Sequence, residues 1–195
     1  VREGLFATIT NVNFDKEALS ALLRRVDEVK RQIVPLCYKC TSACGKNDDY
    51  DMEHLWTAGE DIRSLKSLIL FGIRGMAAYA YHAAVLGYTD PEVDRFFYKA
   101  LFAVGMEDWG MDELLPIVLE VGAVNLKCME LLDKANTETY GNPVPTEVSL
   151  TVEKGPFIII SGHDLFDLKQ LLEQTKDKGL SLIHISEPTR RRGIS

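Results

Sequence analysis

The chain has 195 residues, of which 46% are hydrophobic and 26% are charged, and its formal net charge is −7. This composition is typical of a soluble globular protein, and the acidic balance argues against a nucleic-acid-binding surface. The sequence has no continuous run of about 18 apolar residues and no signal-peptide pattern at its start, so we expect no membrane span and a cytoplasmic location.

Four segments in the first part of the chain carry apolar residues at helical spacing. Local signals mark their ends: Asn13 or Asp15 can cap the first, Gly87 ends the second, and Asp90 followed by Pro91 starts the third. We therefore predict a helical-bundle domain over residues 1–140. Its expected helices cover residues 13–34, 60–87, 90–105 and 111–136.

A change of character follows the fourth segment. Residues 141–154 are rich in turn-forming residues and predict a linker. Residues 157–161, "FIIIS", form a short apolar run that is typical of a strand buried on both faces, and a helix is expected to follow from Asp164 to Gly179.

Strand, turn and helix in this order are the start of an α/β domain. A single strand needs neighbours, so we expect the rest of its parallel sheet to lie outside this chain. The predicted fold is therefore mainly α, with a helical-bundle domain followed by the truncated start (strand-turn-helix) of an α/β Rossmann-like, cluster-binding domain over residues 155–179.

The last segment, residues 180–195, differs from the rest. Its part "LSLIHISEPTRR" resembles the in-frame translation of a sequencing-library adapter, and "RRRGIS" then changes the composition abruptly. We expect this segment to be a non-native tail and exclude it from the fold prediction, which makes the chain an internal piece of a longer protein.

Three cysteines lie close together in "CYKCTSACGK": Cys37, Cys40 and Cys44. Thiolates at this spacing could hold zinc or an iron–sulfur cluster, provided that a fourth ligand comes from elsewhere. They could equally be reduced thiols in a loop between helices, because the second pair of a four-ligand motif is absent. Cys128 stands by itself in an amphipathic segment.

His163 follows the predicted strand in "SGHDL". The carboxyl ends of parallel strands are where α/β proteins place ligands, so His163 could be a metal ligand. It could also be a polar residue of the turn. Asp164 could be the helix cap or could orient the histidine.

Four strings carry a resemblance to a known family: "TNVNFD" (10–15), "EDIRSLKSLILFGIRGMAAYAYHAAVLGY" (60–88), "VNLKCMELLDKANTETYGNPVPT" (124–146) and "GPFIIISGHDLFDLKQLLEQT" (155–175). Together they resemble the hybrid-cluster proteins, also called prismane proteins or hydroxylamine reductases, whose fold is related to that of the nickel carbon monoxide dehydrogenases. The resemblance runs in order over about residues 5–179.

The resemblance implies an enzyme that reduces hydroxylamine to ammonia, or nitric oxide to nitrous oxide. Members carry a 4Fe-4S cluster and a hybrid iron–sulfur–oxygen cluster, and they receive electrons from an external donor protein. By the family's "SGHDL" turn, His163 is implied to be a ligand of the hybrid cluster, and Asp164 is implied to support this histidine without binding the cluster itself. The small nitrogen-containing substrate and the donor are the implied partners.

Other family ligands are not matched. The cysteines of the 4Fe-4S cluster would lie before Val1, and Cys37, Cys40 and Cys44 come too late to replace them. The first ligating glutamate would fall just after Gly179, and Glu187 is not assigned to that role. One histidine cannot hold a four-iron cluster, so we expect no cofactor and no activity in this fragment itself.

Two alternatives from other classes stay open. Four amphipathic segments without a complete site also fit a helical interaction module that has no catalytic activity. The cysteine group fits a small metal-binding domain built on Cys37, Cys40 and Cys44.

Overall fold

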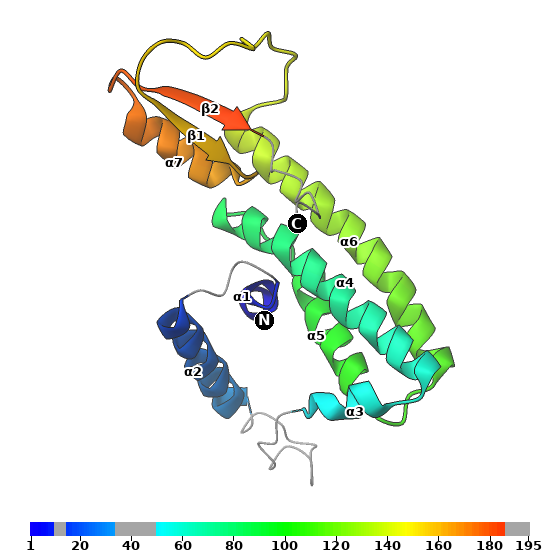
Figure 1. Ribbon diagram of the computed structural model, residues 1–195. Helices are drawn as coiled ribbons and strands as arrows, with labels where there is room; N and C mark the ends of the chain where they lie inside the picture. Colours follow the sequence, from blue (N-terminus) through cyan, green and yellow to red (C-terminus); the bar gives the residue numbers. More distant parts are fainter. Residues whose placement is uncertain (10–14, 34–49, 186–195) are drawn as a thin grey trace, which may run out of the picture. The chain divides into compact units, whose positions relative to one another are not determined.

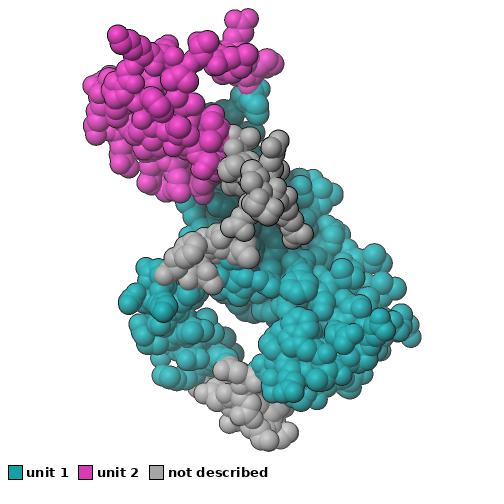
Figure 2. All heavy atoms as spheres, viewed as in Figure 1, with its two compact units in different colours: residues 1–143 teal, residues 144–195 magenta. Residues whose placement is uncertain are grey.

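The computed structural model describes residues 1–9, 15–33 and 50–185, in seven helices and two strands. The chain forms two compact units, Val1–Pro143 and Val144–Ser195 (Figure 2). The predicted class, a helical domain followed by the start of an α/β domain, is confirmed. The elements are α1 (Arg2–Ala7), α2 (Lys16–Ile33), α3 (Met52–Thr57), α4 (Glu60–Val85), α5 (Pro91–Gly105), α6 (Met111–Tyr140), β1 (Phe157–Ser161), α7 (Leu165–Thr175) and β2 (Ser181–Ile185).

The core of the first unit lies between α4, α5 and α6, which run side by side (Figure 1). Helices α4 and α6 are parallel, because Gly72 lies against Val121 and Met76 lies against Cys128, in the same order along both helices. Helix α5 runs in the opposite direction and packs against both of them, as Lys99 pairs with Glu120 and Glu92 pairs with Lys127. Apolar side chains from all three helices fill the core: Ile69, Ile73, Met76, Ala80, Val93, Phe96, Phe97, Ala100, Leu114, Val121 and Val124.

The helix ends follow the local signals of the sequence. Asp90 caps α5 by accepting hydrogen bonds from the N–H groups of Glu92 and Val93, with Pro91 at the first helical position. Gly87, directly after the end of α4, adopts a φ of +88°, which glycine reaches without strain. Asp15 caps α2 through the N–H of Ala18.

Two helices were not predicted, α1 and α3. Each has six residues, which is too short for an apolar period to be recognised in the sequence. Helix α3 begins at a cap, with the carboxylate of Asp51 accepting the N–H of Glu53 at 2.9 Å. Both helices bring apolar side chains, among them Phe6 and Leu55, to the core of the first unit.

The predicted apolar face of α4 is only partly correct. Helical spacing puts Leu68 on the same broad apolar face as Ile69 and Ile73, but Leu68 is 57% exposed, whereas Ala83 is fully buried. Helix α2 has a strong apolar stripe and yet no buried residue, and Leu23 on it is 66% exposed. Helical spacing shows which residues share a face, but not which face is covered.

By length and composition, α4 could cross a membrane, and it is the one such helix in the part of the chain that the structure describes. A core helix of a soluble protein has the same composition. Seven residues of α4 are buried within the helical unit, including Ile69, Ile73 and Met76. Packing within the unit therefore accounts for the buried part of the apolar surface of α4.

The second unit contains β1, α7 and β2. The two strands pair in parallel, from Phe157 opposite Ser181 to Ser161 opposite Ile185 (Figure 1). The expectation that this chain lacks a second strand is therefore wrong, because residues 181–185 had been excluded as a tail. Their run "SLIHI" carries apolar residues that suit a strand once α7 has returned the chain to the sheet edge.

The expectation that β1 is buried on both faces is also wrong for this chain. Phe157 and Ile159 are 48% and 58% exposed, whereas Ile158 and Ile160 are half-buried. A strand points successive side chains to opposite faces, so an alternating pattern means that one face is covered and the other is open. In residues 144–185, the part of this unit that the structure describes, α7 is the only helix, and one helix covers one face.

Candidate functional site

The candidate site lies in the turn between β1 and α7. Gly162 there has a φ of +121°, a conformation that side chains rarely adopt, so a glycine is needed to turn the chain out of the strand. His163 follows it and is exposed. Asp164 then caps α7, with its Oδ1 atom accepting the N–H of Asp167 at 2.9 Å.

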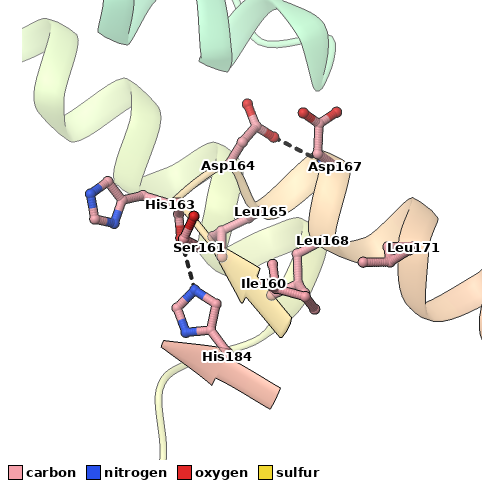
Figure 3. Close-up of a pocket in the computed structure, with 10 residues that line it drawn as sticks. Ile160, Ser161, His163, Asp164, Leu165, Asp167, Leu168, Leu171 and His184 are labelled. Carbon is pink, nitrogen blue, oxygen red and sulfur yellow. Dashed lines mark hydrogen bonds between the residues drawn. The ribbon is translucent and has the colours of Figure 1, made fainter. Parts of the chain in front are cut away.

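This turn forms one wall of an open cavity of about 510 Å³ at the carboxyl end of the strands (Figure 3). The imidazole of His163 extends away from the apolar side chains of Leu168 and Leu171. The carboxylates of Asp164 and Asp167 lie on the other side of the turn. The histidine is thus held between a fixed glycine and a capped helix, with its ring accessible.

A second histidine, His184, reaches the same edge from β2. Its Nε2 atom donates a hydrogen bond to the carbonyl oxygen of Gly162 at 2.8 Å (Figure 3). Sequence reasoning missed this residue because the tail had been set aside. The run "SLIHI" could indicate a strand, but it does not indicate the parallel pairing with β1 that brings His184 to Gly162.

The four cysteines of the sequence fall into two groups. Cys37, Cys40 and Cys44 lie outside the described residues, so their possible role as metal ligands stays a prediction. Cys128 is fully buried in α6, and its thiol donates to the carbonyl oxygen of Met76 at 3.5 Å. Burial raises the pKa of Cys128 to about 11, which keeps the thiol protonated and unsuited to metal binding near neutral pH.

Comparison with known proteins places this chain in a family. A family model described as the Prismane/CO dehydrogenase family matches residues 1–185. The chain belongs to this family. The resemblance found in the sequence is therefore confirmed, and the prismane match extends through the residues of β2.

Curated prismane-family relatives carry the name hydroxylamine reductase. The one from Methanosarcina mazei is 42% identical over 93% of this chain, and the one from Thermoanaerobacter pseudethanolicus is 44% identical over 92%. A relative from Porphyromonas gingivalis is 42% identical over 93%. This chain spans about 36% of the length of each of these relatives.

The residues of this prismane-family chain match an iron–sulfur cluster only in part. His163 supplies one exposed imidazole side chain, and imidazole is a suitable iron ligand. Among the described residues, however, no three His, Cys, Asp or Glu side chains are grouped so that they could hold a metal ion. A cluster of several irons would therefore need ligands beyond those that the structure describes.

Proposed function

We propose that the complete protein is a cytoplasmic iron–sulfur oxidoreductase that reduces small nitrogen species, either hydroxylamine to ammonia or nitric oxide to nitrous oxide. The proposal is supported by the family match and by relatives named hydroxylamine reductase that align with more than nine-tenths of this chain. A hybrid iron–sulfur–oxygen cluster would bind the substrate, and a 4Fe-4S cluster would pass electrons to it from an external donor protein.

His163 is the residue of this chain proposed to hold the hybrid cluster. The observation that carries this role is its position: an exposed imidazole directly after a parallel strand, at the mouth of a cavity. An imidazole binds iron through a ring nitrogen that carries no proton, so the proton must reside on the other nitrogen. In a metal site, a hydrogen-bond acceptor normally fixes that second nitrogen and thereby the orientation of the ring.

Asp164 and Gly162 are proposed to position this histidine. Asp164 fixes the first turn of α7 through the N–H of Asp167, and Gly162 fixes the direction in which the chain leaves β1. Both constraints reduce the freedom of the residue between them. A ligand that is ordered before binding loses less entropy when the metal binds.

The 195-residue chain itself is proposed to be inactive and to bind no cluster. His163 gives one ligand, and the described residues bring no group of three potential ligands together. One metal–ligand bond does not compensate for the missing ligands of a multi-iron cluster.

The test is the iron content of the full-length protein, with and without His163. We expect His163→Ala to remove the iron and the electronic spectrum of the hybrid cluster and to leave those of the 4Fe-4S cluster. His54→Ala is the control, because that ring is also exposed, and it lies on α3 beside Glu107. A full-length protein without iron would refute the enzyme proposal, and full iron content in His163→Ala would refute the ligand assignment alone.

A further inference from the structure

Helix α6 carries two apolar stripes, and only one of them is used in the core. The buried stripe repeats at alternating steps of three and four: Leu114, Ile117, Val121, Val124 and Cys128. The second stripe has steps of four and three: Leu115, Leu119, Gly122, Leu126 and Met129. Its four large side chains are between 45% and 69% exposed. This alternation is the spacing with which a helix packs along another helix.

Helix α4 carries a matching open stripe, formed by Leu68, Phe71, Gly75 and Tyr79. Leu68 and Phe71 are 57% and 50% exposed. These positions flank Gly72 on the helix surface, and Gly72 is the residue of α4 that lies against Val121 of α6.

The stripes of α4 and α6 lie on the same side of the bundle. Two ion pairs join α6 to α5. Glu120 of α6 pairs with Lys99, and Lys127 of α6 pairs with Glu92. The open stripe is on the opposite side of that helix. On α4, Lys66 reaches the end of α5, and the open stripe again lies on the opposite side. Both stripes therefore lie on the side of the α4–α6 pair that faces away from α5.

The size of this α4–α6 face is that of an interface. Its apolar side chains, each roughly half exposed, leave on the order of 800 Å² open, which is about what each partner contributes to a standard specific interface. Monomeric proteins seldom expose a continuous apolar patch above roughly 600 Å². The middle of each stripe is a glycine, and an added Cβ on Gly75 or Gly122 would meet no heavy atom within 4 Å. A backbone could approach closely at both positions.

The length of the relatives points to the occupant. This chain spans about 36% of their length, so nearly two thirds of such a polypeptide lies outside the matched region. We propose that an amphipathic helix from that remaining part packs into the α4–α6 face, along Leu115–Met129, with Leu119 and Leu126 in its contact. At about 1.5 Å per residue this stripe is roughly 21 Å long, so the helix needs about four turns. The inference shares with the proposed function the premise that the chain belongs to a longer polypeptide.

The experiment compares one substitution in two settings. The first is the 195-residue chain, and the second is a full-length chimera in which residues 1–185 replace the matching segment of the Methanosarcina mazei relative. Leu119→Glu places a charge on the face. Tyr98→Glu is the matched control, because Tyr98 on α5 is 63% exposed compared with 69% for Leu119 and lies away from the face. The readouts are the thermal unfolding midpoint, the molar mass from light scattering, and the iron content.

We expect Leu119→Glu to leave the midpoint of the 195-residue chain unchanged and to lower that of the chimera by about 4 °C or more. Tyr98→Glu should change neither midpoint. If Leu119→Glu prevents the chimera from folding, Leu119→Ala should lower the midpoint of the chimera by a smaller amount and leave that of the 195-residue chain unchanged. The proposal would be overturned if Leu119→Glu left the midpoint of the chimera unchanged. It would also be overturned if the chimera were a dimer that Leu119→Glu converts to a monomer, because a second copy of the chain would then occupy the face. Iron content separates the two proposals, since it tests the cluster and not the docking.

Discussion

Gly72 of α4 lies directly against Val121 of α6, so that a Cβ built on Gly72 would come within 2.7 Å of the Cγ1 atom of Val121. Val121 is 8% exposed and packs in the core, so it has little room to retreat. Gly72 therefore sets the distance between the two parallel helices. Gly75, almost one turn later on α4, has no heavy atom within 4 Å of such a Cβ.

We predict opposite effects of alanine at these two glycines of the 195-residue chain. Gly72→Ala should lower the free energy of unfolding by about 1–3 kcal/mol, because the methyl group overpacks the helix contact. Gly75→Ala should raise it by about 0.5–1 kcal/mol, because alanine favours the helix and meets no obstacle. Urea denaturation followed by circular dichroism measures both. Equal effects of the two substitutions would contradict the close approach at Gly72.

Lys66 is predicted to hold the end of α5. It is only 3% exposed, and its Nζ atom donates to the carbonyl oxygen of Met106, the C-cap residue of α5, at 2.6 Å. Lys66→Met would keep the packing of the side chain but leave that carbonyl unpaired, so we expect a loss of about 1–3 kcal/mol in unfolding free energy. Lys134→Met on the exposed surface of α6 is the control and should change stability by less than about 0.5 kcal/mol. A Lys66→Met chain as stable as the unsubstituted one would show that this hydrogen bond contributes nothing net.

Asp164 is predicted to stabilise α7 as its cap. Asp164→Ala removes the acceptor for the N–H of Asp167 and should destabilise the helix by about 0.5–2 kcal/mol. Asp164→Asn keeps a capping oxygen and should retain most of that stability. Hydrogen exchange of the α7 amides measures the difference. If the asparagine variant exchanges as fast as the alanine variant, the negative charge near the helix N-terminus matters more than the hydrogen bond.

Cys128 is predicted to make stability fall at high pH. Burial, the largest cause, raises the pKa of Cys128 to about 11 in the folded chain, against an ordinary value of 9.0. Between these two pH values the unfolded thiol loses its proton while the folded thiol keeps it. Over this range the free energy of unfolding therefore falls as the pH rises, by up to about 2–3 kcal/mol near pH 11.

Urea unfolding at pH 8 and near pH 11 measures this effect, with Cys128→Ala as the comparison. Other groups titrate in the same range, so the test is the difference between the two chains. We expect the unsubstituted chain to lose more stability than Cys128→Ala over this interval. Parallel losses would mean that the thiol does not remain protonated. Below pH 9 the contribution of Cys128 should be constant.

Several features of this fold were readable from local sequence. The caps at Asp90 and Asp164 and the stop at Gly87 were predicted and are present. Each depends on a hydrogen bond or a backbone angle that involves only neighbouring residues. The same is true of the position of His163 between a strand and a helix.

The match to the prismane family was also readable, because long strings carry it in order. The presence of His184 at the carboxyl edge of the sheet could not be predicted from the sequence. His184 comes within hydrogen-bond distance of Gly162 only because β2 pairs in parallel with β1, at a separation of 22 residues. That pairing depends on α7 returning the chain, which no local signal at His184 indicates.

The sequence by itself determined the caps of α5 and α7, the stop of α4, which residues share each helix face, and the family to which the chain belongs. The tertiary structure alone decided which of two apolar stripes on α6 is buried, the one with Val121 or the one with Leu119. It also decided that Leu68 of α4 stays outside the core. The reason is physical: caps and helical period follow from interactions within a few residues, whereas the burial of a face depends on which distant segment packs against it.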